Sequence, residues 1–338
     1  MHILVTGNNG YIGPILTRLL LKGGYRVTGL DTNYYKECRF EEFNFNIKQF
    51  NKDIRHISQQ DFKNIDAVIH LAALSNDPLG EFSQELTQNI NYLATIKIAS
   101  LAKKFGVNRF VFASSCSVYG ISGEEITENS VTAPITSYAI SKVESENSLL
   151  KMASKRFSPT ILRLSTAYGV SPMLRCDIVL NNLVGWAFTT GKIRIMSDGT
   201  PWRPLIHVED ICKAFIACLE APIELVHSET FNVGQKKENY QIKDIANAVK
   251  NAVPGCEVEY TNEHCDSRTY KVNFDKVSTK LKDFFRPKWD IGKGAMELYS
   301  AFKEHNLTFD EFNRYLRLNQ LKRLLEQKKV DKNLFWFR

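Results

Sequence analysis

The segment Ile3-Leu4-Val5-Thr6-Gly7-Asn8-Asn9-Gly10-Tyr11-Ile12-Gly13 decides the fold, because an apolar run leads into a glycine-rich turn and then into a helical pattern. Glycines let the backbone turn tightly and approach a pyrophosphate, and a helix N-terminus presents free N–H groups to the anion. Strand, turn and helix together predict a dinucleotide-binding turn, the alternative being an ordinary βα turn. The spacing is one residue longer than the common G-x-G-x-x-G. The candidate cofactor contacts here are Gly7, Asn9, Gly10, Tyr11, Ile12 and Gly13.

Length and charge restrict the class of protein. The 338 residues suffice for one large domain or two closely associated ones. Apolar residues make up 43% and charged residues 24%, as in ordinary globular proteins. The net charge is +7, but the basic residues are scattered. We therefore expect an anionic small substrate and no nucleic-acid partner.

The cysteines and the apolar runs indicate where the protein works. Seven cysteines include no C-x-x-C pair and no spacing typical of zinc sites. They predict reduced, mostly buried thiols and no metal. The sequence enters a strand at once, and no apolar run approaches the ~18 residues needed to span a bilayer. We expect a cytoplasmic protein with no membrane partner.

The first half of the chain alternates short apolar runs with longer amphipathic ones. Strands are expected at 2–6, 25–30, 66–71, 109–113 and 159–163, and helices near 12–22, 83–105 and 137–155. Buried strands separated by helices predict an α/β fold with a Rossmann-type, doubly wound parallel sheet.

The order of the predicted strands and helices divides the chain into three regions. We expect residues 1–165 to form an NAD-binding domain onto which the segment 205–235 packs back. Shorter elements over 166–294 predict a smaller mixed α/β region that binds the substrate, with a cleft between. Residues 295–338 predict a helical tail. Its apolar end, Leu334-Phe335-Trp336-Phe337, is expected to dock on its own domain or on a partner subunit.

Polar and small residues at strand ends extend the cofactor site. Asp31 ends the second predicted strand, where its carboxylate can accept hydrogen bonds from an adenosine ribose and would repel a 2′-phosphate. NAD is therefore favoured over NADP. Asp53 and Ile54 follow a third strand and could meet the adenine. Small or apolar residues at the end of the fourth strand, Leu71, Ala72 and Ala73, would let the cofactor pass close to the backbone.

Tyr138 and Lys142 lie four residues apart on one face of a predicted helix. A phenol has an ordinary pKa of about 10, and a neighbouring ammonium together with an oxidised nicotinamide would lower it. Tyr138 could then remove a proton from a sugar hydroxyl while hydride leaves the same carbon. A strand that ends in hydroxyl groups, Ser114-Ser115, precedes this helix.

These motifs together resemble the extended short-chain dehydrogenases/reductases that modify nucleotide sugars, over about residues 1–290. The resemblance implies that Ser115 hydrogen bonds the sugar oxygen, that Tyr138 is the acid/base, and that Lys142 binds the nicotinamide ribose and lowers the tyrosine pKa. Tyr138 and Lys142 thus also belong to the cofactor site. Asn91 matches an asparagine that supports this site in the family.

The resemblance also implies a set of substrate contacts. Segments around Asn182, Leu183 and Arg203 resemble those that bind the nucleotide diphosphate in the family. The guanidinium of Arg203 is suited to binding phosphate oxygens. Asp266 resembles a nucleotide contact, but the arginine often found three residues before it is Glu263 here, and Arg268 is a candidate substitute. Ser115, Cys116 and Thr166 complete the candidate substrate contacts.

Departures from the family pattern bear on the reaction. Related 4,6-dehydratases carry Asp-Glu where this chain has Cys116-Ser117, which argues against elimination by their route. Many epimerases carry Asn at the position of Thr166. Cys116 is either a small buried residue or, if it faces the sugar, an additional acid/base group.

We therefore expect an NAD-dependent nucleotide-sugar epimerase acting at C4, in which hydride leaves, the 4-keto sugar rotates, and hydride returns to the other face. The alternatives are a dehydrogenase, ketoreductase or unusual dehydratase with the same triad, and a non-enzymatic NAD-sensing module. The resemblance implies a homodimer that pairs through the helix of Tyr138 and residues near 91–105.

Overall fold

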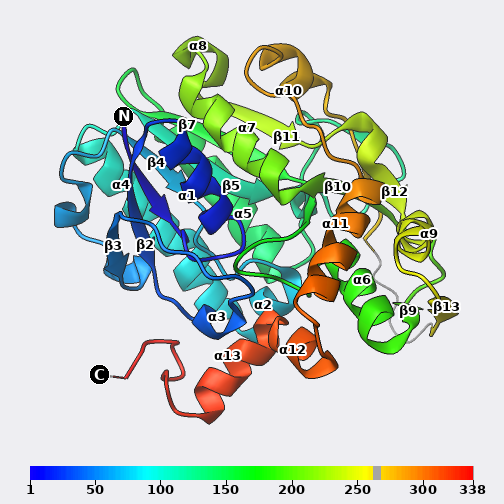
Figure 1. Ribbon diagram of the computed structural model, residues 1–338. Coiled ribbons are helices and arrows are strands. Elements are labelled where there is room, and N and C mark those ends of the chain that lie inside the picture. Colours follow the sequence, from blue (N-terminus) through cyan, green and yellow to red (C-terminus); the bar gives the residue numbers. More distant parts are fainter. Residues whose placement is uncertain (262–267, 338) are drawn as a thin grey trace.

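A seven-stranded, entirely parallel sheet forms the centre of the computed structural model, which describes residues 1–261 and 268–337 (Figure 1). Its strand order is β11-β7-β5-β4-β1-β2-β3, and neighbouring strands pair in parallel throughout. The strands are β1 (His2–Thr6), β2 (Arg26–Asp31), β3 (Lys48–Asn51), β4 (Ala67–His70), β5 (Arg109–Ser115), β7 (Ser158–Leu164) and β11 (Glu229–Val233). The expected strands are thus present.

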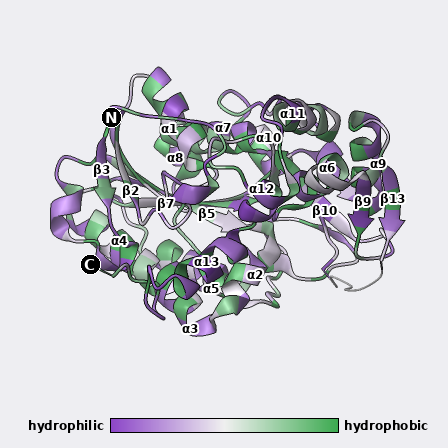
Figure 2. Ribbon diagram, turned by 60° about the horizontal axis from the view of Figure 1, so that its bottom comes forward, coloured by the Kyte–Doolittle hydropathy of each residue, from purple (hydrophilic) through white to green (hydrophobic). Residues whose placement is uncertain are grey.

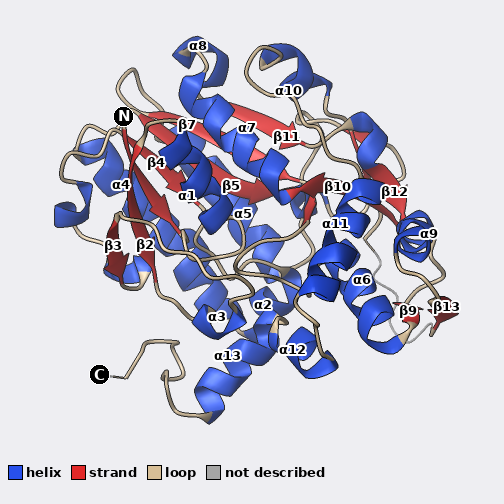
Figure 3. Ribbon diagram, viewed as in Figure 1, coloured by secondary structure: helices blue, strands red, loops and turns tan. Residues whose placement is uncertain are grey.

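Helices cover both faces of this sheet, as Figure 3 shows. Ile3 and Val5 pack into a core with α1 (Gly13–Lys22) and α7 (Val208–Glu220), whereas Leu4 packs into a second core on the opposite face. That second core includes residues of α4 (Ala94–Lys104) and α5 (Ser137–Lys151). Side chains alternate across a strand, so successive residues enter different cores. The predicted doubly wound fold is confirmed.

The helix expected near 83–105 is present as one helical run made of α3 (Gln84–Thr87), a π-helical stretch over Gln88–Leu93, and α4. A separate short helix, α2 (Asp77–Phe82), precedes it. Ser83 lies between α2 and α3; it is extended (φ −158°) and caps α3 by accepting a hydrogen bond from the Leu86 backbone N–H at 3.2 Å. Serine at an N-cap competes with a continuous helix in this way.

A smaller mixed region follows β7, on the right of Figure 1. One small sheet joins β8 (Thr166–Tyr168), β10 (Trp202–His207) and β12 (Asn239–Gln241). Two strand pairs join β9 (Lys192–Ile195) with β13 (Glu257–Tyr260), and β6 (Glu125–Ile126) with β14 (Lys271–Val272). A third core gathers residues of α6 (Val179–Thr190), α9 (Ile242–Ala252), α11 (Ile291–Glu304) and α12 (Phe309–Arg314). The remaining short helices are α8 (Ile223–Val226) and α10 (Asp275–Lys280).

The C-terminal segment returns to the N-terminal half of the same chain. Helix α13 (Arg317–Glu326) buries Leu321 and Leu324 in the core that contains Leu4, and Leu334 joins them. Figure 1 shows α13 and the end of the chain below α3. Of the two docking sites expected for this tail, its own subunit is the one observed.

Figure 2 shows that helices of both layers carry hydrophilic and hydrophobic segments in turn, as amphipathic helices do. Among the described residues, no helix combines the length and apolar character required to cross a membrane. The six described cysteines are free and buried, and Cys265 lies outside the described residues.

Candidate functional site

A cavity of about 750 Å³ lies where the carboxyl ends of the central strands meet the smaller region. Ligands bind at this edge in open parallel sheets. Most predicted site residues line it: Gly7, Gly10, Tyr11, Ile12, Asp31, Asp53, Ile54, Leu71, Ala72, Ala73, Ser115, Tyr138, Lys142, Thr166, Asn182, Leu183, Arg203 and Arg268. Asn9, Gly13, Asn91 and Cys116 are not among the lining residues. Asp266, like Glu263, lies outside the described residues.

The turn after β1 depends on its glycines. Gly7 has φ +76°, and a Cβ added there would lie 2.8 Å from the Ala72 nitrogen. At Gly13, an added Cβ would lie 2.2 Å from the Asn8 carbonyl oxygen. Both contacts are closer than real Cβ atoms allow, so the turn packs backbone against backbone. This leaves main-chain N–H groups and a helix N-terminus along the cavity wall, an arrangement that fits the pyrophosphate of a dinucleotide.

Asp31 links the turn to the end of β2. Its carboxylate accepts hydrogen bonds from the backbone N–H of Asn9 at 3.0 Å and from the backbone N–H of Asn33 at 2.7 Å. Burial raises the pKa of this carboxyl. Asn9 thus holds the turn in place through Asp31 instead of lining the cavity. Asp53 forms an ion pair with Arg55, whose Nη2 lies 2.7 Å from Asp53 Oδ2.

Ser115, Tyr138 and Lys142 all line the cavity. Lys142 is buried, donates to the Ala113 carbonyl oxygen at 2.7 Å, and lies 5.6 Å from the centre of the Tyr138 ring. Burial lowers the pKa of Lys142 to about 7. The helix of both residues begins at the N-cap Thr136, whose hydroxyl accepts from the Ala139 amide at 3.2 Å.

The pKa of Tyr138 is raised in the protein without cofactor, whereas the sequence-based expectation of a lowered pKa concerns the site with an oxidised nicotinamide bound. Burial raises it to about 12, the Asp77 carboxylate adds to this, and a hydrogen bond with Ser115 offsets only part of the rise. In the protein alone, desolvation of the phenolate outweighs the nearby positive charge.

Asn91 and Cys116 both serve the surrounding scaffold. Asn91, in the π-helical stretch, accepts from the Leu74 amide at 2.8 Å and donates to the Leu74 carbonyl at 3.1 Å. It therefore fixes the backbone that follows β4. Cys116 is buried and donates to the Arg163 carbonyl at 3.3 Å, and burial raises the pKa of its thiol to about 12.

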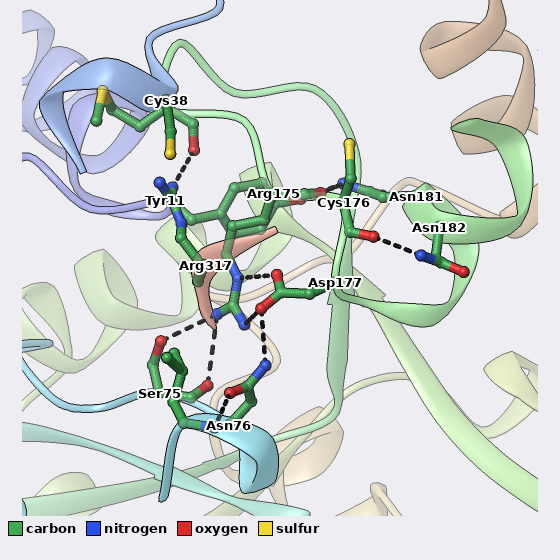
Figure 4. Close-up of polar contacts among 12 residues, drawn as sticks. Tyr11, Cys38, Ser75, Asn76, Arg175, Cys176, Asp177, Asn181, Asn182 and Arg317 are labelled. Carbon is green, nitrogen blue, oxygen red and sulfur yellow. Dashed lines mark hydrogen bonds and ion pairs between the residues drawn. The ribbon is translucent and has the colours of Figure 1, made fainter. Parts of the chain in front are cut away.

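A polar network at the cavity wall was not expected from the sequence. Arg175 donates to Asp177 at 2.9 Å and to the Ser75 hydroxyl at 3.1 Å, while the Asn76 amide reaches Asp177 at 2.8 Å (Figure 4). The network joins the loop after β4 to the loop before α6. No local motif identifies these residues, because the partners lie about a hundred positions apart.

Arginines line the side of the cavity toward the smaller region. They are Arg194 on β9, Arg203 on β10, and Arg268 before β14. Arg203 donates to the Trp202 carbonyl at 2.8 Å, and Arg268 forms an ion pair with Asp77, next to Tyr138 in the cavity. Guanidinium groups in this position can bind the oxygens of a diphosphate.

Comparison with known protein families and sequences agrees with this geometry. The sequence profile of the NAD dependent epimerase/dehydratase family matches residues 3–234. A UDP-glucuronate 4-epimerase of Thermodesulfobacterium geofontis is 27% identical over 322 residues, covering 90% of this chain and 97% of its own. A UDP-glucose 4-epimerase of Bacillus subtilis is 28% identical over 297 residues, covering 77% of this chain and 84% of its own.

Solved structures share the fold. A UDP-glucuronic acid 4-epimerase from Bacillus cereus, in complex with UDP-glucuronic acid and NAD, has a TM-score of 0.78 at 24% identity and covers 90% of this chain and 99% of its own. The NDP-hexosamine 5,6-dehydratase TunA has a TM-score of 0.81 at 22% identity and covers 92% and 100%. The family match confirms NAD as the predicted cofactor, and the chain belongs to the NAD dependent epimerase/dehydratase family.

Proposed function

We propose that this protein is an NAD-dependent nucleotide-sugar epimerase that acts at C4 through a transient 4-keto sugar. The observation that carries the proposal is the meeting of Ser115, Tyr138 and Lys142 in one cavity, between a dinucleotide-binding turn and a group of arginines. This placement puts an acid/base group where cofactor and sugar can both reach it.

The N-terminal half holds the cofactor. The turn from Gly7 to Gly13 binds the pyrophosphate, Asp31 the adenosine ribose, and Asp53 and Ile54 flank the adenine. Lys142 binds the nicotinamide ribose. When bound, NAD supplies a reversible acceptor for the hydride of the sugar carbon.

Tyr138 and its neighbours move the proton. Ser115 positions the O4 hydroxyl by a hydrogen bond, and Tyr138 accepts its proton and later returns it. A pKa of about 12 in the protein alone means that the phenolate needs added positive charge, which an oxidised nicotinamide provides. Lys142 has a pKa of about 7, so near neutral pH its protonation state changes and affects that of Tyr138.

The smaller region holds the nucleotide diphosphate. Arg203 and Arg268 neutralise the phosphates, and Asn182 and Leu183 at the start of α6 line the same side of the cavity. Thr166 lies beside the sugar. The named relatives act on UDP-sugars, which supports uridine as the base.

We further propose that the protein works in the cytoplasm as a homodimer paired through α4 and α5. Leu93, Phe105 and Ile140 lie on or next to these helices, and each is at least two-fifths exposed. Ile98 is unsuited to such a contact because its own subunit buries it completely. Sedimentation of the purified chain tests the dimer.

The test of the reaction is incubation with UDP-glucuronic acid, UDP-glucose and related nucleotide sugars, followed by NMR of the products. We expect inversion at C4 without net NADH and without loss of water. Net NADH would instead indicate a dehydrogenase, and a product lighter by one water a dehydratase.

The matched variants are Tyr138→Phe and Tyr25→Phe. We expect Tyr138→Phe to lower the rate about a thousandfold, because the acid/base group is lost, while NAD binding persists. Tyr25 bonds Glu220 at 3.0 Å on the exposed surface, so Tyr25→Phe should retain full activity. An unchanged rate in Tyr138→Phe would contradict the assigned role.

A further inference from the structure

We propose that Arg317, carried by the C-terminal helix α13, binds the phosphates of the dinucleotide. The proposal rests on the cofactor-binding role of the cavity. Arg317 is only 1% exposed and lines the same cavity as Gly10 and Tyr11. Nothing in the glycine motif identifies it, since it lies about three hundred residues further along the chain.

Arg317 is held beside the dinucleotide-binding turn. Its Nη2 donates to the Met173 carbonyl oxygen at 2.8 Å. The segment of Met173 is itself bound to the turn, because the Ser171 hydroxyl donates to the Tyr11 carbonyl at 2.6 Å and the Tyr11 hydroxyl donates to the Gly169 carbonyl at 2.7 Å. Residues 169–173 thus connect the guanidinium to the turn that is proposed to bind the pyrophosphate.

The other neighbours of Arg317 leave part of its hydrogen-bonding capacity unused. Its guanidinium carbon lies 4.4 Å from the centre of the Tyr35 ring, and the Cys38 thiol is adjacent. Nη1 has no hydrogen-bond partner in the structure, and neither has the Tyr35 hydroxyl. Within residues 1–261 and 268–337, no carboxylate forms an ion pair with Arg317.

The nearest acids already have other partners. Asp177 is bound by Arg175 at 2.9 Å, in the cluster that Figure 4 shows together with Arg317. Asp31 accepts the two backbone N–H groups described above. Both carboxylates therefore act on Arg317 only at longer range. A buried guanidinium with an unused N–H group and no direct ion pair is unfavourable, and a bound pyrophosphate would supply both partners.

The rest of the C-terminal segment fixes this arrangement to the adenosine side of the cavity. Trp336 donates from Nε1 to the Thr32 carbonyl at 2.7 Å, and Gln320 donates to the Tyr34 carbonyl at 3.3 Å. The Tyr34 hydroxyl donates to the Leu334 carbonyl. These anchors flank Asp31, so the segment that carries Arg317 forms part of the cofactor site.

The experiment measures the dissociation constants of NAD, ADP and adenosine by calorimetry, without any sugar substrate. The variants are Arg317→Met, Arg317→Lys and the control Lys322→Met, which removes an exposed cation from the same helix. We expect Arg317→Met to weaken NAD and ADP binding at least about tenfold, because charge-assisted hydrogen bonds to phosphate are lost. Adenosine binding should change less than about twofold, and Arg317→Lys should be intermediate.

Several outcomes would overturn the proposal. Unchanged NAD and ADP binding in Arg317→Met would do so, as would an equal loss of adenosine binding, which indicates a structural role. If Arg317→Met does not fold, hydrogen exchange in the natural protein decides: ADP should slow exchange in α13 more than adenosine does at equal saturation, and equal slowing would contradict us. Failure of the natural protein to bind NAD would reject the proposed function as well.

Discussion

The cofactor half and the substrate half of the cavity are built in different ways. Around the glycine turn, main-chain groups form the wall, and they come from the turn itself and from the neighbouring strand ends at Leu30 and Ala72. In the proposed substrate half, side chains form the wall, and their partners are far apart: Arg268 contacts Asp77 across 191 residues. A site whose wall is made of backbone is disturbed by any added side-chain atom. A site whose wall is made of side chains can tolerate substitution of one residue at a time.

The difference has consequences for specificity. Main-chain N–H groups are the same in every protein, so the turn can recognise phosphate but carries little information about a particular molecule. The side chains of the proposed substrate half, including Asp77, Arg203 and Arg268, differ in charge and reach. They are therefore the part of the cavity that can select a sugar.

The largest expected effect is on the backbone-built half. Gly7→Ala would place a methyl group 2.8 Å from the Ala72 nitrogen, so the turn must shift, and we expect NAD affinity to fall about a hundredfold. Gly24 has the same kind of backbone, with φ +78° and open space around it. Gly24→Ala should therefore lose about 1 kcal/mol of stability and no NAD affinity. Calorimetric titration with NAD measures both, and equal losses would contradict the comparison.

A smaller effect is expected in the side-chain-built half. Arg203→Met removes one guanidinium from the arginine group, and we expect KM for the nucleotide sugar to rise about tenfold with NAD affinity unchanged. Arg156, an exposed arginine, provides the control Arg156→Met. Steady-state kinetics with saturating NAD tests the expectation. A parallel loss of NAD affinity would show that the two halves are not separable in this way.

The smallest effect is expected at Cys116. The pKa of its thiol is raised to about 12 by burial, so the thiol stays protonated across the neutral range and donates to a backbone carbonyl. Cys116→Ala should keep the rate within about twofold from pH 6 to pH 9 and destabilise the protein by about 1 kcal/mol. If the pH–rate profile of Cys116→Ala lacked one of the limbs seen in the natural protein, that result would indicate that Cys116 is an acid/base group.

The sequence was sufficient for the parts of the molecule that local patterns determine. Strands such as 2–6 and 109–113 are buried on both faces, so their apolar runs are visible without any tertiary information. The cofactor turn and the spacing of Tyr138 and Lys142 are equally local. Their common position on the cavity wall agrees with the pattern.

Other features depend on packing that the sequence does not display. The short helix α2, which was not expected, is separated from α3 by Ser83, whose side chain caps α3. Arg175 and Arg317 enter the cavity only because distant loops and helices come together. The raised pKa of Tyr138 in the protein alone could not be predicted either, since the extent of burial and the nearness of Asp77 are properties of the folded chain.

The docking of the C-terminal segment sets an order of events during synthesis. Tyr34 and Leu334, whose contact joins the two ends of the chain, are 300 residues apart. At translation rates of 5–20 residues per second, Leu334 is added roughly 15 to 60 s after Tyr34. The β1–β2 region therefore emerges from the ribosome long before the residues that close the adenosine side. A nascent chain in that interval has the glycine turn but not Arg317, so the proposed cofactor site is complete only in the last stage of folding.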